Sequence, residues 1–327
     1  MQNLIFTIDY EIHGNGDGSP AELMIEPTNR LMDLLDEFGA KLVIFADVGE
    51  ILRFKEYLDT YGHDAYDYEA IVAQLQDALR RGHDVQLHIH SSYFGARFEN
   101  GKWQQNWKKY NLAGLEADEI RSIVATCKGF LEETLRPVKP DYSCYVFRAA
   151  NWSMHPSPHI VDALAGEGIC IDTSVYKYGR QKGWVDYDYS EAFDATFPYR
   201  ASRLDVCRFD PEGPLVEFPI HCELKPIGAF FSPIRVFRAL RALKHRHERN
   251  YAEEPAPDKP SAPKTGLPSK LRKVLFSMHP RKFDFNQLTG RQMVKTLKSI
   301  RGAEEARSYI TLIGHSKSFI PYNGRTL

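Results

Sequence analysis

The 327-residue chain lacks the features that mark several classes of protein. Its five cysteines form no Cys-x-x-Cys pair, which argues against a disulfide framework and favours reduced thiols. It has no run of about 18 apolar residues, so we expect no transmembrane helix. Its first eleven residues lack the basic and apolar regions of a signal peptide, so we expect a cytoplasmic protein.

An excess of charge of one sign is also absent. The chain has 42 Lys and Arg against 43 Asp and Glu, which leaves a formal net charge of −1. A broad nucleic-acid-binding face would need net positive charge, so we expect no nucleic acid partner. At 43% hydrophobic residues, the chain is apolar enough to bury a large core.

Short apolar runs alternate with longer helical patterns, which is typical of βαβ units. We expect strands at 4–8, 41–45, 84–89, 142–147, 169–171, 215–220 and 309–313. We expect helices at 27–38, 68–81, 117–135, 158–165, 232–247 and 289–300. Seven strands alternating with helices predict one α/β barrel-like domain with a parallel inner sheet.

Two stretches fall outside this alternation. Residues 181–211 are aromatic and charged with little periodicity, which predicts a long insertion over one face. Residues 250–270 hold five prolines among charges, which predicts a mobile Pro-rich loop. Because the helical pattern resumes after this loop, we expect a single domain over 1–327.

Titratable and aromatic side chains gather where the predicted strands end. In parallel α/β folds, chemistry occurs at the carboxyl ends of strands. Five strands supply such residues there: Asp9 and Glu11, then His88 and His90, then Arg148 and Trp152, then His221, and last His315. We expect these ends to meet at one rim.

Two of these pairs have a spacing of two residues, which on a strand places both side chains on one face. Asp9 and Glu11 are either such a site pair or surface acids. His88 and His90 are either structural histidines or ligands of one ion, and two imidazoles with a carboxylate form a common catalytic zinc set.

The remaining candidates each have a structural alternative. Arg148 either anchors a loop or pairs with Asp9 and keeps it ionised. His315 is either a general acid or a structural histidine. His221 is a weaker candidate, because the adjoining loop decides whether it enters the site. Trp103 is either a platform for sugar stacking or part of a lid packed on the core.

Five segments resemble, in order, the motifs of the polysaccharide deacetylase family (NodB homology, carbohydrate esterase family 4). They are Phe-Thr-Ile-Asp-Tyr-Glu at 6–11, Gly-His-Asp-Val-Gln-Leu-His at 82–88, Phe-Arg-Ala-Ala-Asn-Trp at 147–152, Gly-Ile-Cys-Ile-Asp-Thr-Ser at 168–174 and Leu-Ile-Gly-His at 312–315. The likeness is closer to WbmS-type members, which are associated with O-antigen or capsule biosynthesis.

The resemblance implies a distorted (β/α)7-type barrel with long loop insertions. It implies a metal-dependent hydrolase that removes an N-acetyl or similar acyl group from a sugar during surface polysaccharide biosynthesis. The sugar would be nucleotide-linked, lipid-linked or oligomeric, and the divalent metal would be zinc. The near-zero charge of the chain fits a neutral or amide-bearing sugar better than a polyanion.

The resemblance also implies roles for residues. Asp9 would be the general base, His315 would protonate the leaving amine, and Arg148 would orient Asp9. Glu11 and His88 would hold the metal. Trp152, His221 and Trp103 are candidates for substrate contacts.

The chain departs from the family pattern at the metal site. Ser92 occupies the position of the second metal histidine, and His90 is the residue that could replace it. Tyr10 occupies the position of the second acid, with Glu11 one residue later.

Two other functions remain open. One is an amidohydrolase or PHP-like metallohydrolase, since a His-x-His pair also suits those folds. Those enzymes carry the pair on the first strand, where this chain has Asp9 and Glu11. The other is a non-catalytic, sugar-binding member with a degenerate metal site, which Ser92 keeps open.

Overall fold

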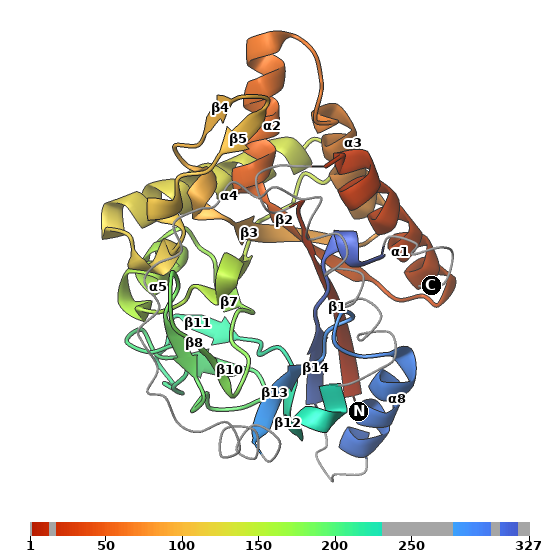
Figure 1. Cartoon of the computed structure of the whole chain (residues 1–327), viewed down its shortest axis with the longest axis vertical. Coiled ribbons are helices and arrows are strands. Elements are labelled where there is room, and N and C mark those ends of the chain that lie inside the picture. The colour runs from red at the N-terminus through yellow and green to blue at the C-terminus, as the bar shows by residue number, and fades with distance from the viewer. Residues whose placement is uncertain (1, 13–17, 231–276, 302–307, 320–327) are drawn as a thin grey trace, which may run out of the picture.

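An eight-stranded sheet curls around the centre of the molecule (Figure 1). The computed structural model describes residues 2–12, 18–230, 277–301 and 308–319. The predicted helix at 232–247 and the Pro-rich loop at 250–270 lie outside the described residues. The sheet consists, in spatial order, of β10 (Tyr199–Ala201), β11 (Leu215–Glu217), β7 (Ile171–Asp172), β6 (Val146–Ala149), β3 (Asp84–Ile89), β2 (Leu42–Asp47), β1 (Gln2–Tyr10) and β14 (Ser308–Leu312).

The pairing of these strands confirms the predicted α/β barrel-like fold. β10 runs antiparallel to β11, and the other seven strands run parallel to their neighbours. Past the end of β11, Ile220 forms a parallel bridge with Thr311 of β14. Asp284 forms another with Ile313. These bridges bring the chain after β11 beside β14, so the sheet curls into a distorted barrel.

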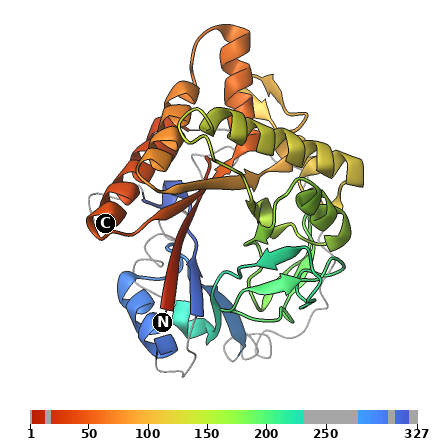
Figure 2. The same ribbon diagram turned by 180° about the vertical axis from the view of Figure 1, so that it is seen from behind.

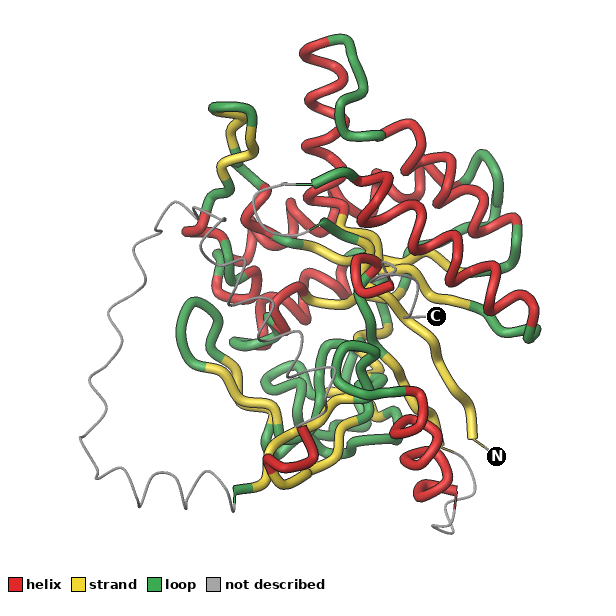
Figure 3. The backbone as a smooth tube through the Cα atoms, turned by 45° about the vertical axis from the view of Figure 1, so that its right-hand side comes forward, coloured by secondary structure: helices red, strands yellow, loops and turns green. Residues whose placement is uncertain are grey.

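Within the described ranges, six α-helices accompany the sheet, and most of them gather on its outer side (Figures 2 and 3). They are α1 (Glu26–Glu37), α2 (Val48–Tyr61), α3 (Tyr68–Arg80), α4 (Ala117–Leu135), α5 (Ser157–Gly166) and α8 (Gly290–Arg301). Each amphipathic helix turns its apolar face to the sheet. In α4, for example, Ile120, Val124, Leu131 and Leu135 are buried at helical spacing. None of the helices within the described ranges has the length and apolar character needed to cross a bilayer.

Three small antiparallel two-stranded sheets complete the described structure: β4 (Arg97–Glu99) with β5 (Lys102–Gln104), β8 (Gly179–Gln181) with β9 (Tyr187–Tyr189), and β12 (Cys222–Pro226) with β13 (Met278–Lys282). The segment 181–211, expected as an insertion, contains β9 and β10. Its side chains Tyr187, Tyr189 and Tyr199 are buried in the main core. The segment is therefore packed into the body of the molecule.

Most predicted elements match the structure to within one or two residues. The strand expected at 215–220 ends at Glu217, and two further elements differ for a physical reason. Helix α2 was not predicted, because its buried residues Val48, Ile51 and Phe54 occupy only its first half. Strand β6 begins at Val146 instead of residue 142. The amide groups of Tyr145 and Val146 both donate to Oε1 of Gln86, so a side chain replaces strand pairing at this entry.

Gly49 permits α2 to lie directly against the end of β3. A Cβ atom at Gly49 would lie 2.8 Å from the backbone oxygen of His90 and 3.4 Å from Oδ1 of Asp47. We expect Gly49→Ala to lower the free energy of unfolding by about 1–3 kcal/mol, since backbone must move to relieve the contact.

The matched control is Gly129→Ala in α4, where no atom lies within 4 Å of the added methyl. It should raise stability by about 0.5–1 kcal/mol, because alanine favours the helix. Urea unfolding of both variants measures the difference. Equal stability of Gly49→Ala and the wild type would show that α2 does not pack this closely against the backbone of His90.

Candidate active site

The carboxyl ends of four strands bring six predicted site residues together. Asp9 and Glu11 come from β1, His88 and His90 from β3, Arg148 from β6, and His315 from the residues after β14. β14 pairs with β1, and β3 pairs with β6, so the four ends lie at one rim of the sheet. All but His315 are buried, and the side chain of His315 is 29% exposed. The buried residues therefore form a floor, and His315 lies at its opening.

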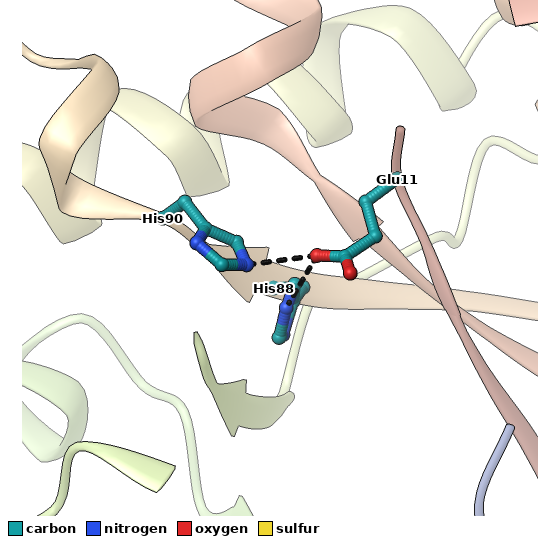
Figure 4. A group of neighbouring side chains, drawn as sticks. All are labelled: Glu11, His88 and His90. Atoms are coloured by element: carbon teal, nitrogen blue, oxygen red, sulfur yellow. Dashed lines mark hydrogen bonds and ion pairs between the residues drawn. The ribbon is translucent and has the colours of Figure 1, made fainter. Parts of the chain in front are cut away.

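Glu11, His88 and His90 point toward one another (Figure 4). Oε2 of Glu11 lies 2.8 Å from Nε2 of His90 and 3.5 Å from Nε2 of His88. One ligand atom from each residue lies within 4.8 Å of the other two. Two imidazole nitrogens and one carboxylate oxygen at this separation suit a divalent transition metal such as zinc.

The surroundings of the two imidazoles orient them. Nδ1 of His88 lies 2.9 Å from the backbone oxygen of Arg148, so Nδ1 donates and Nε2 keeps its lone pair for a ligand. The backbone amide of His90 donates to Oδ1 of buried Asp47 at 3.0 Å. The ring hydrogen bond of His88 is of the kind that a metal-binding histidine uses, and the bond of His90 to Asp47 fixes the backbone at His90.

Ser92 lies on the other side of the same loop. Its buried hydroxyl donates to Oε1 of Gln105 at 2.6 Å. Of the two residues considered for the third ligand position, His90 is the one that faces Glu11.

Asp9 is held by a buried ion pair. Nη1 of Arg148 donates to Oδ1 of Asp9 at 2.9 Å, and Nε of Arg148 donates to the backbone oxygen of Thr173 at 3.2 Å. The guanidinium group lies 4.1 Å from the ring centroid of Phe45. Burial disfavours the charged form of Asp9, but Arg148, with His88 and His315, holds the pKa of Asp9 below its usual range. Asp9 is therefore ionised and fixed in orientation at neutral pH.

His315 can reach both carboxylates of the pocket. Its Nε2 lies 3.7 Å from Oδ2 of Asp9 and 3.7 Å from Oε1 of Glu11. Its partial exposure leaves it accessible to a bound molecule.

Three carboxylates act on the imidazole of His88. Burial alone would lower the pKa of His88, but Asp9, Glu11 and Asp47 raise it to about 9. A buried site that favours an imidazolium so strongly also favours a divalent cation.

Lys317 was not predicted as a site residue. Its Nζ donates to Oε1 of Glu11 and to the backbone oxygen of Ile12, both at 3.0 Å. Burial would raise the pKa of Glu11, but Lys317 and His90 hold it well below the usual range. Its position two residues after His315 in the sequence could have identified it as a candidate site residue.

A second layer of acids lies behind the pocket and was also missed. Glu50 accepts the hydroxyl of Tyr93 at 2.6 Å and the amide of Ile12 at 2.7 Å. Burial and the nearby Asp47 raise the pKa of Glu50 to about 7. Asp47 ends β2 and Glu50 belongs to α2, the helix that was not predicted. Extending the second strand by two residues would have identified Asp47.

The three predicted substrate contacts occupy different environments. Trp152 lies in a short turn after β6, with its ring partly exposed. His221 is buried, with Nδ1 3.4 Å from Oγ1 of Thr196, beside the bridge that closes the barrel. Trp103 is 2% exposed in a separate cluster with Tyr93 and Ala96, so it packs a hairpin and presents no face for a sugar.

No family model and no curated protein matches this chain. Three solved structures illustrate what its fold is similar to. A protein from Mycobacterium smegmatis described as a polysaccharide deacetylase is 16% identical, covering 98% of this chain and 79% of that one, with a TM-score of 0.43. A 4-alpha-glucanotransferase from Thermococcus litoralis is 15% identical over 99% of this chain and 34% of that one, with a TM-score of 0.46. Puue allantoinase is 11% identical over 97% and 78%, with a TM-score of 0.44.

A buried pair of acids lies close enough to Arg148 to feel its charge. Glu217 and Asp172 belong to neighbouring strands and hydrogen-bond to each other. Burial and the charge of Asp172 hold the pKa of Glu217 well above its usual range, and burial also raises the pKa of Asp172. The folded state therefore keeps a proton that the unfolded chain releases above the ordinary glutamate pKa.

This proton makes stability depend on pH. Its contribution is complete below the unfolded pKa of glutamate and is lost as pH rises toward the raised folded value. We expect the free energy of unfolding of the wild type to fall as pH rises above about 5, by up to ~1.4 kcal/mol per pH unit. Glu217→Gln should flatten this slope, because the amide donates to Asp172 without titrating.

Denaturant unfolding between pH 5 and pH 9 tests this expectation, with Glu133→Gln on the exposed side of α4 as control. The control should keep the wild-type profile. Identical profiles for Glu217→Gln and the wild type would contradict the shared proton.

Proposed function

We propose that this protein is a divalent-metal-dependent hydrolase that removes an N-acetyl group from a sugar. The observation that carries the proposal is the convergence of Glu11, His88 and His90 beside a fixed, ionised Asp9 and an accessible His315. With the motif resemblance, this supports a carbohydrate deacetylase, and we propose a surface-polysaccharide precursor in the cytoplasm as its substrate. The expected metal is zinc.

The residues present fit such a metal. Glu11, His88 and His90 supply three ligand atoms, and the hydrogen bond from His88 to the backbone of Arg148 leaves Nε2 free for ligation. When bound there, a divalent metal would polarise the acetyl carbonyl and lower the pKa of a ligated water.

The side chains of the chain itself would move the protons. Asp9, oriented by Arg148, accepts a proton from the attacking water. His315 donates a proton to the leaving amine, which its exposure lets it reach. Arg148 is a positioning residue, since it is fully buried behind Asp9. The opposite charges around Asp9 and His315 suit separate roles as base and acid.

The two alternative functions are less well supported. A PHP-like enzyme would carry its histidine pair on the first strand, and here that pair belongs to β3. A non-catalytic member was considered because of Ser92. The orientation of His90 toward Glu11 offers a third ligand in its place, which favours an active site.

The metal-ligand set leads to a test by metal analysis. We expect His90→Ala to lower the zinc content of the purified, zinc-loaded protein well below one equivalent, since two ligands bind weakly. Ser92→Ala is the matched control in the same loop and should keep the wild-type content. Equal zinc in His90→Ala and the wild type would exclude His90 as a ligand.

The role of Asp9 has a separate test. Asp9→Asn keeps an oxygen that accepts from Arg148 but removes the base, so acetate release from N-acetyl sugars should fall by about 100-fold or more. Circular dichroism and zinc content should stay unchanged, and Asp141→Asn, an exposed change, should keep full activity. Undiminished turnover by Asp9→Asn would refute the proposed base.

A further inference from the structure

Lys282 of β13 contacts aromatic residues that follow β6 and β7, beside the candidate active site. It is the last residue of β13, and its Nζ lies 4.0 Å from the ring centroid of Trp152 and 4.8 Å from that of Tyr176. Trp152 follows β6 and Tyr176 follows β7, both far from β14 in the strand order. The lysine therefore extends from one side of the rim to aromatic residues on the other.

The backbone after Lys282 runs alongside the pocket. The amide of Phe285 donates to the backbone oxygen of Ile313 at 3.1 Å, and the amide of Asp9 donates to that of Gly314 at 2.9 Å. One extended segment, residues 313–314, thus separates the 283–285 segment from Asp9. The charge of Asp284 acts most strongly on Lys282, and the charges of Asp9 and Arg148 act on it as well. Lys282 consequently borders the same pocket as the proposed base.

The ammonium group of Lys282 has no acceptor within the protein as described. Over the residues that the structure describes, no oxygen accepts a hydrogen bond from its Nζ, and Asp284, the carboxylate whose charge acts on it most, forms no ion pair with it. Two other cations of the pocket differ, since Arg148 is paired with Asp9 and Lys317 with Glu11. An ammonium group has three N–H donors. The aromatic rings attract its positive charge but do not accept these donors as an oxygen would.

The aromatic rings hold this ammonium in a defined place. Trp152 has a φ of 61°, and Asn151 before it has a φ of 54°, both in the left-handed region that non-glycine residues rarely adopt. The edge of Tyr176 packs on Trp152 at 5.0 Å between ring centroids. Backbone strain of this kind persists only where surrounding contacts fix the residue, and it is common at ligand-binding sites.

We propose that Lys282 binds an anionic group, a carboxylate or a phosphate, of the sugar whose N-acetyl group faces Glu11, His88 and His90. This proposal rests on the proposed function and specifies its substrate class. The partly buried ammonium can donate a charge-assisted hydrogen bond to any sugar oxygen, and an anionic group would in addition neutralise its charge. The near-neutral net charge of the chain favoured a neutral sugar. A cation at the binding pocket is a more direct indicator of the substrate's charge than the net charge of the whole chain.

Steady-state acetate release by the zinc-loaded protein tests the proposal. The substrates are N-acetylglucosamine, its 6-phosphate and its uronic acid, so the two charged sugars distinguish a phosphate from a carboxylate. We expect at least one charged sugar to have a kcat/KM about ten-fold or more above that of the neutral sugar. Lys282→Met should remove this preference by raising KM for the charged sugar, with little change in kcat.

Two further variants separate a specific role from a structural one. Lys282→Arg keeps the positive charge and should retain part of the preference. Lys225→Met removes a lysine from β12, the strand paired with β13, where it contacts Glu223, and should behave as the wild type. Equal kcat/KM for charged and neutral sugars in the wild type, or a preference that survives in Lys282→Met, would overturn the proposal.

A binding measurement keeps this proposal distinct from the proposed function. Calorimetric titration with glucuronate, glucose 6-phosphate and glucose needs no turnover. If no N-acetyl sugar releases acetate, tighter binding of a charged sugar by the wild type than by Lys282→Met would support the role of Lys282 while the deacetylase proposal fails. Equal binding of charged and neutral sugars would overturn the role of Lys282.

Discussion

The buried pair between Arg148 and Asp9 is the contact on which the site depends. Between their strands lie β3 and β2, so in a flat sheet the two backbones would be about 14 Å apart at ~4.8 Å per strand. Their side chains nevertheless meet at 2.9 Å. Arg148 therefore reaches across β3 and β2, and its guanidinium group lies over the ring of Phe45 in β2. A fully buried guanidinium requires a partner such as Asp9, because an unpaired charge there would be strongly destabilising.

The curl places the carboxyl ends of distant strands in one pocket. Buried carboxylates at Asp9, Glu11 and Asp47 create a negative potential that no single strand would produce. Three positively charged groups from different elements lie around these carboxylates. They are Arg148 of β6, Lys317 after β14 and Lys282 of β13. The pocket thus combines a site suited to a divalent cation with an unpaired ammonium at its border.

Much of this arrangement could be predicted from local sequence patterns. The strand at 84–89 and the helix at 117–135 were predicted at their observed bounds, because alternation and helical spacing are clear there. The two-residue spacing of His88 and His90 likewise predicts a shared face. Helix α2 escaped prediction because its apolar residues end after Phe54. Asp47 and Glu50 were missed with it, since their role depends on how α2 packs against β3.

The sequence by itself determined which chemical groups end each strand, because periodicity and strand position are local properties. It left open whether His90 or Ser92 faces Glu11, and whether Trp103 stacks on a sugar or packs on the core. The tertiary structure decided these points: Ser92 bonds Gln105, Trp103 is enclosed beside Tyr93, and Trp152 meets Lys282 from 130 residues further along the chain. The direction and partner of a side chain are set by long-range packing, which no local pattern records.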